Sequence, residues 1–116
     1  MRPESPKLLE DIRDAAQYII DRTTGTTLDL FCQNRDLRQV VERNFEIIGE
    51  AVRRLSHHDP DTAQRVTDFQ QIIAFRNILI HAYDVIDPAR VWRNIDGSLP
   101  RLKREVEQLL RDANQD

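Results

Sequence analysis

The fold is decided by the stretch LRQVVERNFEIIGEAVRRL, residues 37–55. Its apolar side chains recur every three or four residues, as they do along one face of an α-helix. This stripe consists of Leu37, Val40, Val41, Phe45, Ile48, Ala51, Val52 and Leu55. Asn34 precedes it as a candidate N-cap, and the polar segment SHHDPD at 56–61 follows it. The stretch therefore predicts one long amphipathic helix.

A second stripe of the same period lies nearer the N-terminus, over residues 8–20. Ser5 is placed to act as its N-cap, and Pro6 suits the first helical position. The segment TTGTT at 23–27 breaks the pattern, and the short apolar piece LDLF at 28–31 follows. We expect a helix that ends near residue 22.

A third helix is predicted from about residue 62 to residue 83. Asp59 or Asp61 can cap it, and Pro60 can open it. From Ile72 onward the segment is apolar on nearly all sides, so we expect its second half to be the most buried part of the protein.

A fourth stripe follows the dipeptide Asp87-Pro88 and runs over residues 91–110. Gly97 and Pro100 within it predict a kink or a short break. Amphipathic segments joined by short connections favour an all-α fold, an antiparallel bundle of four or five helices. The length and the absence of a second boundary indicate one domain, spanning 1–116.

The composition is that of an ordinary globular protein: 40% hydrophobic and 32% charged residues, with a formal net charge of −3. No apolar run approaches the length of a membrane span. A lone cysteine, Cys32, suggests a reducing, cytoplasmic setting. Of 17 basic residues only Lys7 and Lys103 are lysine. The arginines suit phosphate binding, although arginine-rich codon usage explains them equally well.

Most local motifs of catalysis are missing from the sequence. It contains no glycine-rich phosphate loop, no zinc-type Cys/His spacing and no H-E-x-x-H. His57 and His58 form a tandem pair in an Asp-rich loop, without a third fixed ligand beside them. We therefore expect neither a metal site nor a cofactor.

One segment is chemically unusual: FRNILIHAYD, residues 75–84, places polar groups in the most apolar part of the chain. On a helix, Arg76 and Tyr83 share one face, while Asn77 and His81 share another. Arg76 and His81 can meet at one point through long side chains, through a nearby helix end, or through a second copy of the chain.

Each of these residues also has a purely structural explanation. Arg76 can pair with a buried acid such as Glu50, and His81 can make ordinary core hydrogen bonds. Tyr83 can lie at the edge of the core, and Asn77 can satisfy a neighbouring carbonyl. Together, however, four polar groups within eight residues of a buried helix are costly unless they are used.

The order Arg76, four residues, His81, one residue, Tyr83 resembles the R-x4-H-x-Y signature of HepT-type toxins in the HEPN superfamily. The segment FEIIGEAVRRLS at 45–56 is similar to the second-helix pattern of that family. The segment at 91–110, interrupted by Leu-Pro, is similar to its final helix. The resemblance spans nearly the whole chain.

The resemblance implies a HEPN-like helical bundle and a metal-independent endoribonuclease. It implies a homodimer whose cleft brings two copies of the motif to one RNA phosphate. In that arrangement His81 transfers a proton, Arg76 stabilises the charge on the phosphate, and Asn77 orients either group. The implied partner is an MntA-like nucleotidyltransferase antitoxin that adds AMP to Tyr83. Negative charge and bulk there would repel RNA.

Two further interpretations concern charge and class. Glu50 is a candidate supporting residue that neutralises Arg76 in the free protein. A local patch formed by Arg53, Arg54, Arg76 and Arg90 can offset the acidic net charge. The alternative to an enzyme is a non-catalytic helical subunit that binds a nucleotidyltransferase and its nucleotide.

Overall fold

The computed structural model describes residues 1–115, and the side chains of all of these except Tyr83 and Gln115. Seven α-helices and one short 3-10 helix make up these residues, which contain no strand. In chain order they are α1 (Ser5–Thr23), α2 (Leu28–Gln33), α3 (Arg35–His58), α4 (Pro60–Ala63), α5 (Phe69–His81), η1 (Tyr83–Val85), α6 (Pro88–Asp96) and α7 (Ser98–Gln115).

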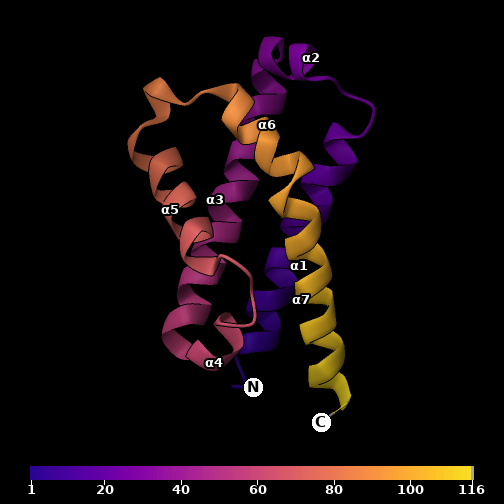
Figure 1. Cartoon of the computed structure of the whole chain (residues 1–116), viewed down its shortest axis with the longest axis vertical. Helices are drawn as coiled ribbons and strands as arrows, with labels where there is room; N and C mark the ends of the chain where they lie inside the picture. Colours follow the sequence, from indigo (N-terminus) through magenta and orange to yellow (C-terminus); the bar gives the residue numbers. More distant parts are fainter. Residues whose placement is uncertain (116) are drawn as a thin grey trace.

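The four longer helices α1, α3, α5 and α7 form an antiparallel bundle (Figure 1). The chain rises along α1, descends along α3, rises along α5 and descends along α6 and α7. Both termini therefore lie at the end of the bundle where α4 lies, whereas α2 lies at the opposite end (Figure 1). The all-α, antiparallel fold that the sequence predicts is confirmed.

The core lies between α1, α3 and α7, and each contributes the stripe that its sequence period predicts. The largest side chains with almost no exposed surface include Leu9, Ile12 and Ile19 of α1, Ile48, Val52 and Leu55 of α3, and Leu99 and Leu109 of α7. Phe31 of α2 is fully buried and packs against Trp92 of α6, with ring centroids 5.3 Å apart. The short α2 thereby closes one end of the bundle.

The N-terminus of α1 differs from the prediction, because Ser5 is the first helical residue and not the N-cap. Its hydroxyl instead donates a hydrogen bond of 2.8 Å to Oδ2 of Asp59. The same oxygen accepts from the backbone N–H of Arg2 at 3.0 Å and from the Thr62 hydroxyl at 2.7 Å. The Ser5 hydroxyl therefore donates to a buried carboxylate, a strong charge-assisted hydrogen bond, whereas an N-cap serine accepts from a backbone N–H of the first turn.

The Asp59 carboxylate thus joins the N-terminal segment to the junction of α3 and α4. As predicted, Asp59 also caps the following helix, since its Oδ1 accepts from the Thr62 N–H. Burial alone would raise the pKa of this carboxyl, but the hydrogen bonds from Arg2, Thr62 and Ser5 outweigh that effect. They hold the pKa of Asp59 well below its usual range.

The single third helix predicted from residue 62 is wrong, because the chain breaks between α4 and α5. Asp68 there adopts the left-handed region, with φ of 57°. Contacts with α7 stabilise this break. Asp68 pairs with Arg101 at 3.0 Å, and Glu105 accepts from the N–H and hydroxyl of Thr67 at 3.0 and 2.6 Å. These long-range contacts outweigh the local helical preference of the connector.

The burial expected for the second half of this segment is also wrong. Leu79 is the one residue classed as buried in α5. Ile72, Ile73, Phe75 and Ile78 are partly buried, and Ile80 is 36% exposed. The reason is the position of α5, which packs chiefly against α3 at the side of the bundle. An apolar helix packed on one side keeps apolar surface on the other.

The predicted interruption in the last stripe is confirmed. Asp87 caps α6 by accepting from the Ala89 N–H, and α6 ends at Gly97, where α7 begins in a new direction. Asn34 likewise caps α3 by accepting from the Leu37 N–H at 3.0 Å. None of the helices formed by residues 1–115 is long and apolar enough to cross a membrane.

The Asp59 contacts predict a specific loss of stability. Asp59→Asn should lower the free energy of unfolding by about 1.5–3 kcal/mol, because buried hydrogen bonds to a charged acceptor are lost. The exposed neighbour Asp61 provides the matched control, and Asp61→Asn should change the free energy of unfolding by less than about 0.5 kcal/mol. Urea denaturation at neutral pH measures both, and equal effects would contradict the assignment.

The same measurement against pH tests the lowered pKa. A group with a depressed folded-state pKa stabilises the fold above its unfolded pKa, near ~3.9 for Asp. Its contribution is lost as pH falls below that value. The unmodified chain should therefore lose stability more steeply than Asp59→Asn between about pH 5 and pH 2.

Candidate functional site

The four polar residues of the unusual segment lie on α5 and just after it. The Arg76 side chain is 24% exposed and turns toward α3. Asn77 and His81 are exposed. Tyr83 begins η1, and its side chain lies outside what the structure describes. The Arg76 side chain is thus half-buried, and those of Asn77 and His81 lie at the surface.

The contact between Arg76 and Gly49 sets the distance between α5 and α3. A Cβ atom built on Gly49 would lie 2.2 Å from Cβ and 2.7 Å from Cγ of Arg76. Both separations are far below contact distance, so no larger residue fits at position 49 without displacing α5. Glycine is required here because two helix backbones approach closely.

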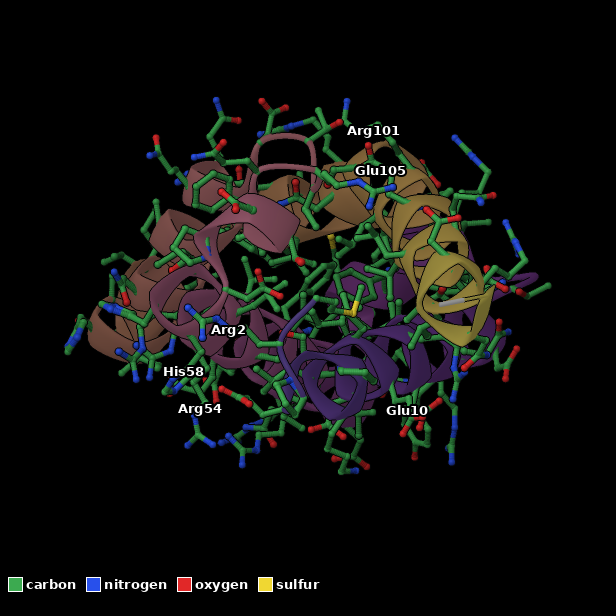
Figure 2. All side chains as sticks on the ribbon, turned by 90° about the horizontal axis from the view of Figure 1, so that it is seen from below. Arg2, Glu10, Arg54, His58, Arg101 and Glu105 are labelled. Atoms are coloured by element: carbon green, nitrogen blue, oxygen red, sulfur yellow. The ribbon has the colours of Figure 1, made fainter. Side chains whose placement is uncertain are left out.

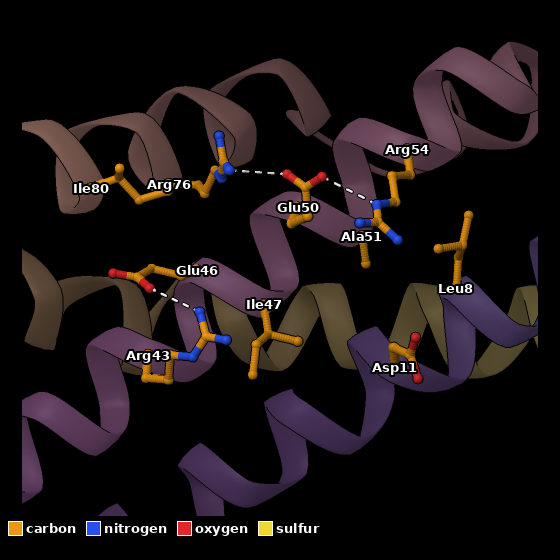
Figure 3. Close-up of a pocket in the computed structure, with 10 residues that line it drawn as sticks. All are labelled: Leu8, Asp11, Arg43, Glu46, Ile47, Glu50, Ala51, Arg54, Arg76 and Ile80. Carbon is orange, nitrogen blue, oxygen red and sulfur yellow. Dashed lines mark hydrogen bonds and ion pairs between the residues drawn. The ribbon is translucent and has the colours of Figure 1, made fainter.

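The residue after that glycine, Glu50, collects three guanidinium groups around one carboxylate. Oε2 lies 3.0 Å from Nη2 of Arg76 across the two helices. Oε1 lies 2.7 Å from Nη2 of Arg53 and 3.1 Å from Nε of Arg54. Figure 3 shows Glu50 between Arg76 and Arg54. The arrangement is an ion-pair cluster with two positive charges in excess.

This cluster determines the ionisation of Glu50. Hydrogen bonds from Arg53 lower the pKa of Glu50, burial raises it, and the hydrogen bond from Arg54 and the charge of Arg76 lower it again, to about 2. Glu50 is therefore an anion at neutral pH.

Asn77 completes the surroundings of Arg76, because its Oδ1 accepts a hydrogen bond of 3.0 Å from Nη1. The Nε of Arg76 is buried without a hydrogen-bond partner among the described residues. The guanidinium is therefore held at its two terminal nitrogens, by Glu50 and by Asn77. The stem is held by its contact with Gly49.

His81 is the last residue of α5, and its side chain points away from this cluster. It lies five positions after Arg76, which turns the two side chains about 140° apart around the helix. Arg76 turns inward to α3, whereas His81 is exposed. Of the three routes that can unite them, the long side chain of Arg76 is already engaged by Glu50.

A groove runs beside Arg76 along α3 toward α1, with a volume of about 230 Å³. Figure 3 shows its lining, in which Ile47, Ala51 and Ile80 alternate with charged side chains. Arg43 pairs with Glu46 at 3.2 Å, and Lys7 pairs with Asp11 at 2.8 Å. Each of these outer pairs has no net charge, so the excess positive charge beside the groove lies around Glu50.

The structure brings some of the candidate residues together and leaves others apart. It brings Arg76, Asn77 and Glu50 into contact and adds Arg53 and Arg54 from the suggested basic patch. Arg90 lies elsewhere, 5.8 Å from the centroid of the Phe75 ring. Gly49 escaped sequence reasoning, although a glycine inside an apolar helical stripe was a visible signal of close packing.

The described residues include no group of three or more His, Cys, Asp or Glu that could hold a metal ion. His57 and His58 at the end of α3 are both exposed.

Comparison with known families gives a match over residues 10–109 to the family described as ribonuclease HepT-like. The chain belongs to the HepT-like ribonuclease family. The family match covers α3, α5 and α6 completely, together with the three-arginine cluster and the R-x4-H-x-Y segment.

Relatives in this HepT-like family agree in length. A candidate RNase of Methanocaldococcus jannaschii is 34% identical over 99 residues, which are 85% of this chain and 90% of that protein. A candidate RNase of Caldanaerobacter subterraneus subsp. tengcongensis is 29% identical over 88% of this chain and 90% of its own length. The probable ribonuclease HepT of Thermococcus cleftensis is 29% identical, over 94% and 98%. No solved structure matches the chain significantly.

The Gly49 contact of this HepT-like chain predicts an unusual response to alanine. Inside a helix, Gly→Ala normally stabilises by about 1 kcal/mol. Here Gly49→Ala should instead destabilise by about 1–3 kcal/mol, because the methyl group overlaps Arg76.

A double-mutant cycle measured by urea denaturation tests the cause. In an Arg76→Gly background the overlapping Cβ and Cγ are absent, so Gly49→Ala should cost much less. An equal cost in both backgrounds would mean that Arg76 is not the obstacle.

Proposed function

We propose that this chain is the toxin of a HepT/MntA-type toxin–antitoxin system, a metal-independent endoribonuclease that acts in the cytoplasm. The observation that carries the proposal is the guanidinium of Arg76. It is anchored at a fixed place beside Asn77 and one and a half helical turns before an exposed histidine. Membership of the HepT-like family supports it, as do relatives that are named as ribonucleases.

Arg76 supplies the electrostatic part of the reaction. Its terminal nitrogens now contact Glu50 and Asn77, and a phosphate oxygen can take the place of the Glu50 oxygen. Glu50 would then keep its bonds to Arg53 and Arg54, so it is not left as an unpaired buried anion. One well-aimed donor to a developing negative charge contributes about 2.7–4 kcal/mol to transition-state stabilisation.

His81 supplies the proton transfer. The 2′-hydroxyl loses its proton and attacks the adjacent phosphorus, the bond from phosphorus to the 5′-oxygen breaks, and that oxygen takes up a proton. The products are a 2′,3′-cyclic phosphate and a 5′-hydroxyl. Exposure leaves the His81 imidazole free to approach either oxygen.

A homodimer resolves the divergence of Arg76 and His81. The outward face of α5 carries Ala74, Asn77 and His81, with Ile80 beside them. This partly apolar face suits a second copy of the same helix across a two-fold axis. In such a pair, His81 of one copy can approach a phosphate held by Arg76 of the other.

The first test is RNA cleavage by purified variants. His81→Ala should lower the cleavage rate by about 10²–10⁴-fold, because the proton-transferring group is lost. Its melting temperature should stay unchanged, since the side chain is exposed on its own chain. Its mass in solution, measured in parallel, separates loss of catalysis from loss of the dimer. Gln71→Ala, an exposed position on another side of the same helix, is the matched control.

The opposite result would favour the non-catalytic alternative. If the unmodified chain cuts no RNA and His81→Ala leaves all behaviour unchanged, the chain acts as a helical subunit for a nucleotidyltransferase. Arg76→Ala would then weaken binding to that partner.

Tyr83 is the proposed site of control. It lies two residues beyond His81, at the start of η1. An adenylate attached there adds negative charge and bulk close to the exposed imidazole, and so repels an RNA backbone. An MntA-like nucleotidyltransferase is the partner proposed to add it.

Mass spectrometry of the chain made beside its antitoxin tests this control. The mass should rise by one or more adenylate units, and Tyr83→Phe should abolish the increase. Tyr18, the other tyrosine in the chain, lies on α1 and is exposed, so Tyr18→Phe is the matched control that keeps the increase. Loss of the added mass with Tyr18→Phe in place of Tyr83→Phe would refute the assignment.

A further inference from the structure

The cluster of Arg53, Arg54 and Arg76 around Glu50 continues as a line of hydrogen-bond donors along one face of α3. Counting from Glu50, the residues three, four, seven and eight positions on share its face of the helix. They are Arg53, Arg54, His57 and His58. We call these four residues the α3 strip. With about 1.5 Å of rise per residue, it reaches about 12 Å from Glu50 toward the end of α3.

The strip is open to solvent. The Arg53 and Arg54 side chains are 42% and 59% exposed, and both histidines are exposed. Figure 2 shows Arg54 and His58 on the same side of the molecule. At the far end, Arg2 is held near the strip, because its backbone N–H donates to Asp59, the residue after His58.

The charge along this face is positive in a protein whose net charge is negative. Arg53, Arg54 and Arg76 oppose the single carboxylate of Glu50. Other acids are engaged: Asp11 pairs with Lys7, and Glu46 pairs with Arg43. Asp59, the residue after His58, is buried and accepts from Arg2, Ser5 and Thr62. Asp61 lies beyond the strip, in a separate depression with Arg2 and Arg65. A local excess of positive charge of this kind attracts polyanions despite the bulk charge.

We propose that the α3 strip binds the RNA backbone on one side of the phosphate held by Arg76. This inference rests on the proposed ribonuclease function and specifies its substrate. The substrate is a single-stranded RNA that extends several nucleotides beyond the cut. A narrow line of donors on one helix face follows the phosphates of one flexible strand.

The composition of the strip also determines how it reads RNA. Arginine and histidine N–H groups donate to phosphate oxygens, which carry no sequence information. No Phe, Tyr or Trp occurs between Glu50 and His58, so this segment provides no such ring for a base to stack on. Recognition along the strip is therefore of length and charge, with little preference for particular bases.

The experiment measures binding of an uncleavable probe, a 2′-O-methyl oligonucleotide of about ten nucleotides. For single strands, the logarithm of affinity falls with the logarithm of salt concentration by about 0.7 per phosphate contact. Arg53→Gln/Arg54→Gln should therefore reduce the slope by about 1.4 and weaken binding. Binding of the corresponding dinucleotide, which is centred on Arg76, is measured in parallel, because loss of Arg53 and Arg54 also leaves Glu50 paired with Arg76 alone.

Two further variants make the result specific. Arg104→Gln/Arg111→Gln removes the same charge from exposed positions of α7 and should leave the slope unchanged. His57→Ala/His58→Ala removes both imidazole donors, which are not among the partners of Glu50 in the structure, so the position of Arg76 is undisturbed. It should weaken binding of the long probe but not of the dinucleotide.

The outcomes separate this inference from the proposed function. If both strip variants bind the long probe with the slope of the α7 control, the strip does not bind RNA. Unchanged RNA binding with lost binding of the antitoxin would also overturn it and make the strip a protein interface. Cleavage of the unmodified oligonucleotide, measured in parallel, tests the ribonuclease itself, whereas the salt slopes decide the strip whether or not cleavage is seen.

Discussion

The contact between Gly49 and Arg76 is the constraint on which the site depends. It lets α5 approach α3 so closely that the arginine stem lies against a bare backbone. At that separation Nη2 of Arg76 lies 3.0 Å from Oε2 of Glu50 across the two helices. Asn77 and His81 belong to the same helix as Arg76, so the packing of α5 on α3 also sets the direction in which they point. One missing Cβ atom therefore positions an ion-pair cluster and an exposed imidazole together.

The helices around this contact differ in how much they bury. The helices α1, α3 and α7 bury the side chains that make the fold stable. The α5 helix buries few of its side chains. The connector before it contains Asp68 in the left-handed region, and α7 contacts this connector at Asp68 and Thr67. The candidate residues Arg76, Asn77 and His81 thus lie on a helix that keeps much of its surface free. That division is common where a rigid scaffold presents a site.

Periodicity predicted most of the fold, because the buried stripes of residues 8–20, 37–55 and 91–110 depend on local spacing alone. It failed where distant contacts decided the conformation. The break near Asp68 depends on Arg101 and Glu105, more than thirty residues away. The Ser5 hydroxyl turned from a cap to a carboxylate 54 positions along the chain. Neither partner is visible in a helical period.

The candidate site, like the fold, is predictable from the sequence only in part. Motif spacing identified Arg76, Asn77 and His81 and suggested Glu50 as a partner, since residue type and order suffice for that. It could not predict that Arg76 turns inward and His81 outward, because that depends on which side of α5 meets α3. The expectation of a deeply buried α5 failed for a related reason. Apolar residues on all sides of a helix show that surface must be covered, but they do not say by which molecule.

The low pKa of Glu50 has a consequence for how Arg76 can be released. With a pKa of about 2, this carboxylate cannot be neutralised by the acidity of any living compartment. Protonation is therefore excluded as the trigger that frees the arginine. What remains is exchange: another anion must compete with the carboxylate for the same guanidinium, in proportion to its concentration and its charge. In the proposed ribonuclease, ordinary salts and free phosphates would therefore compete with the RNA for this guanidinium.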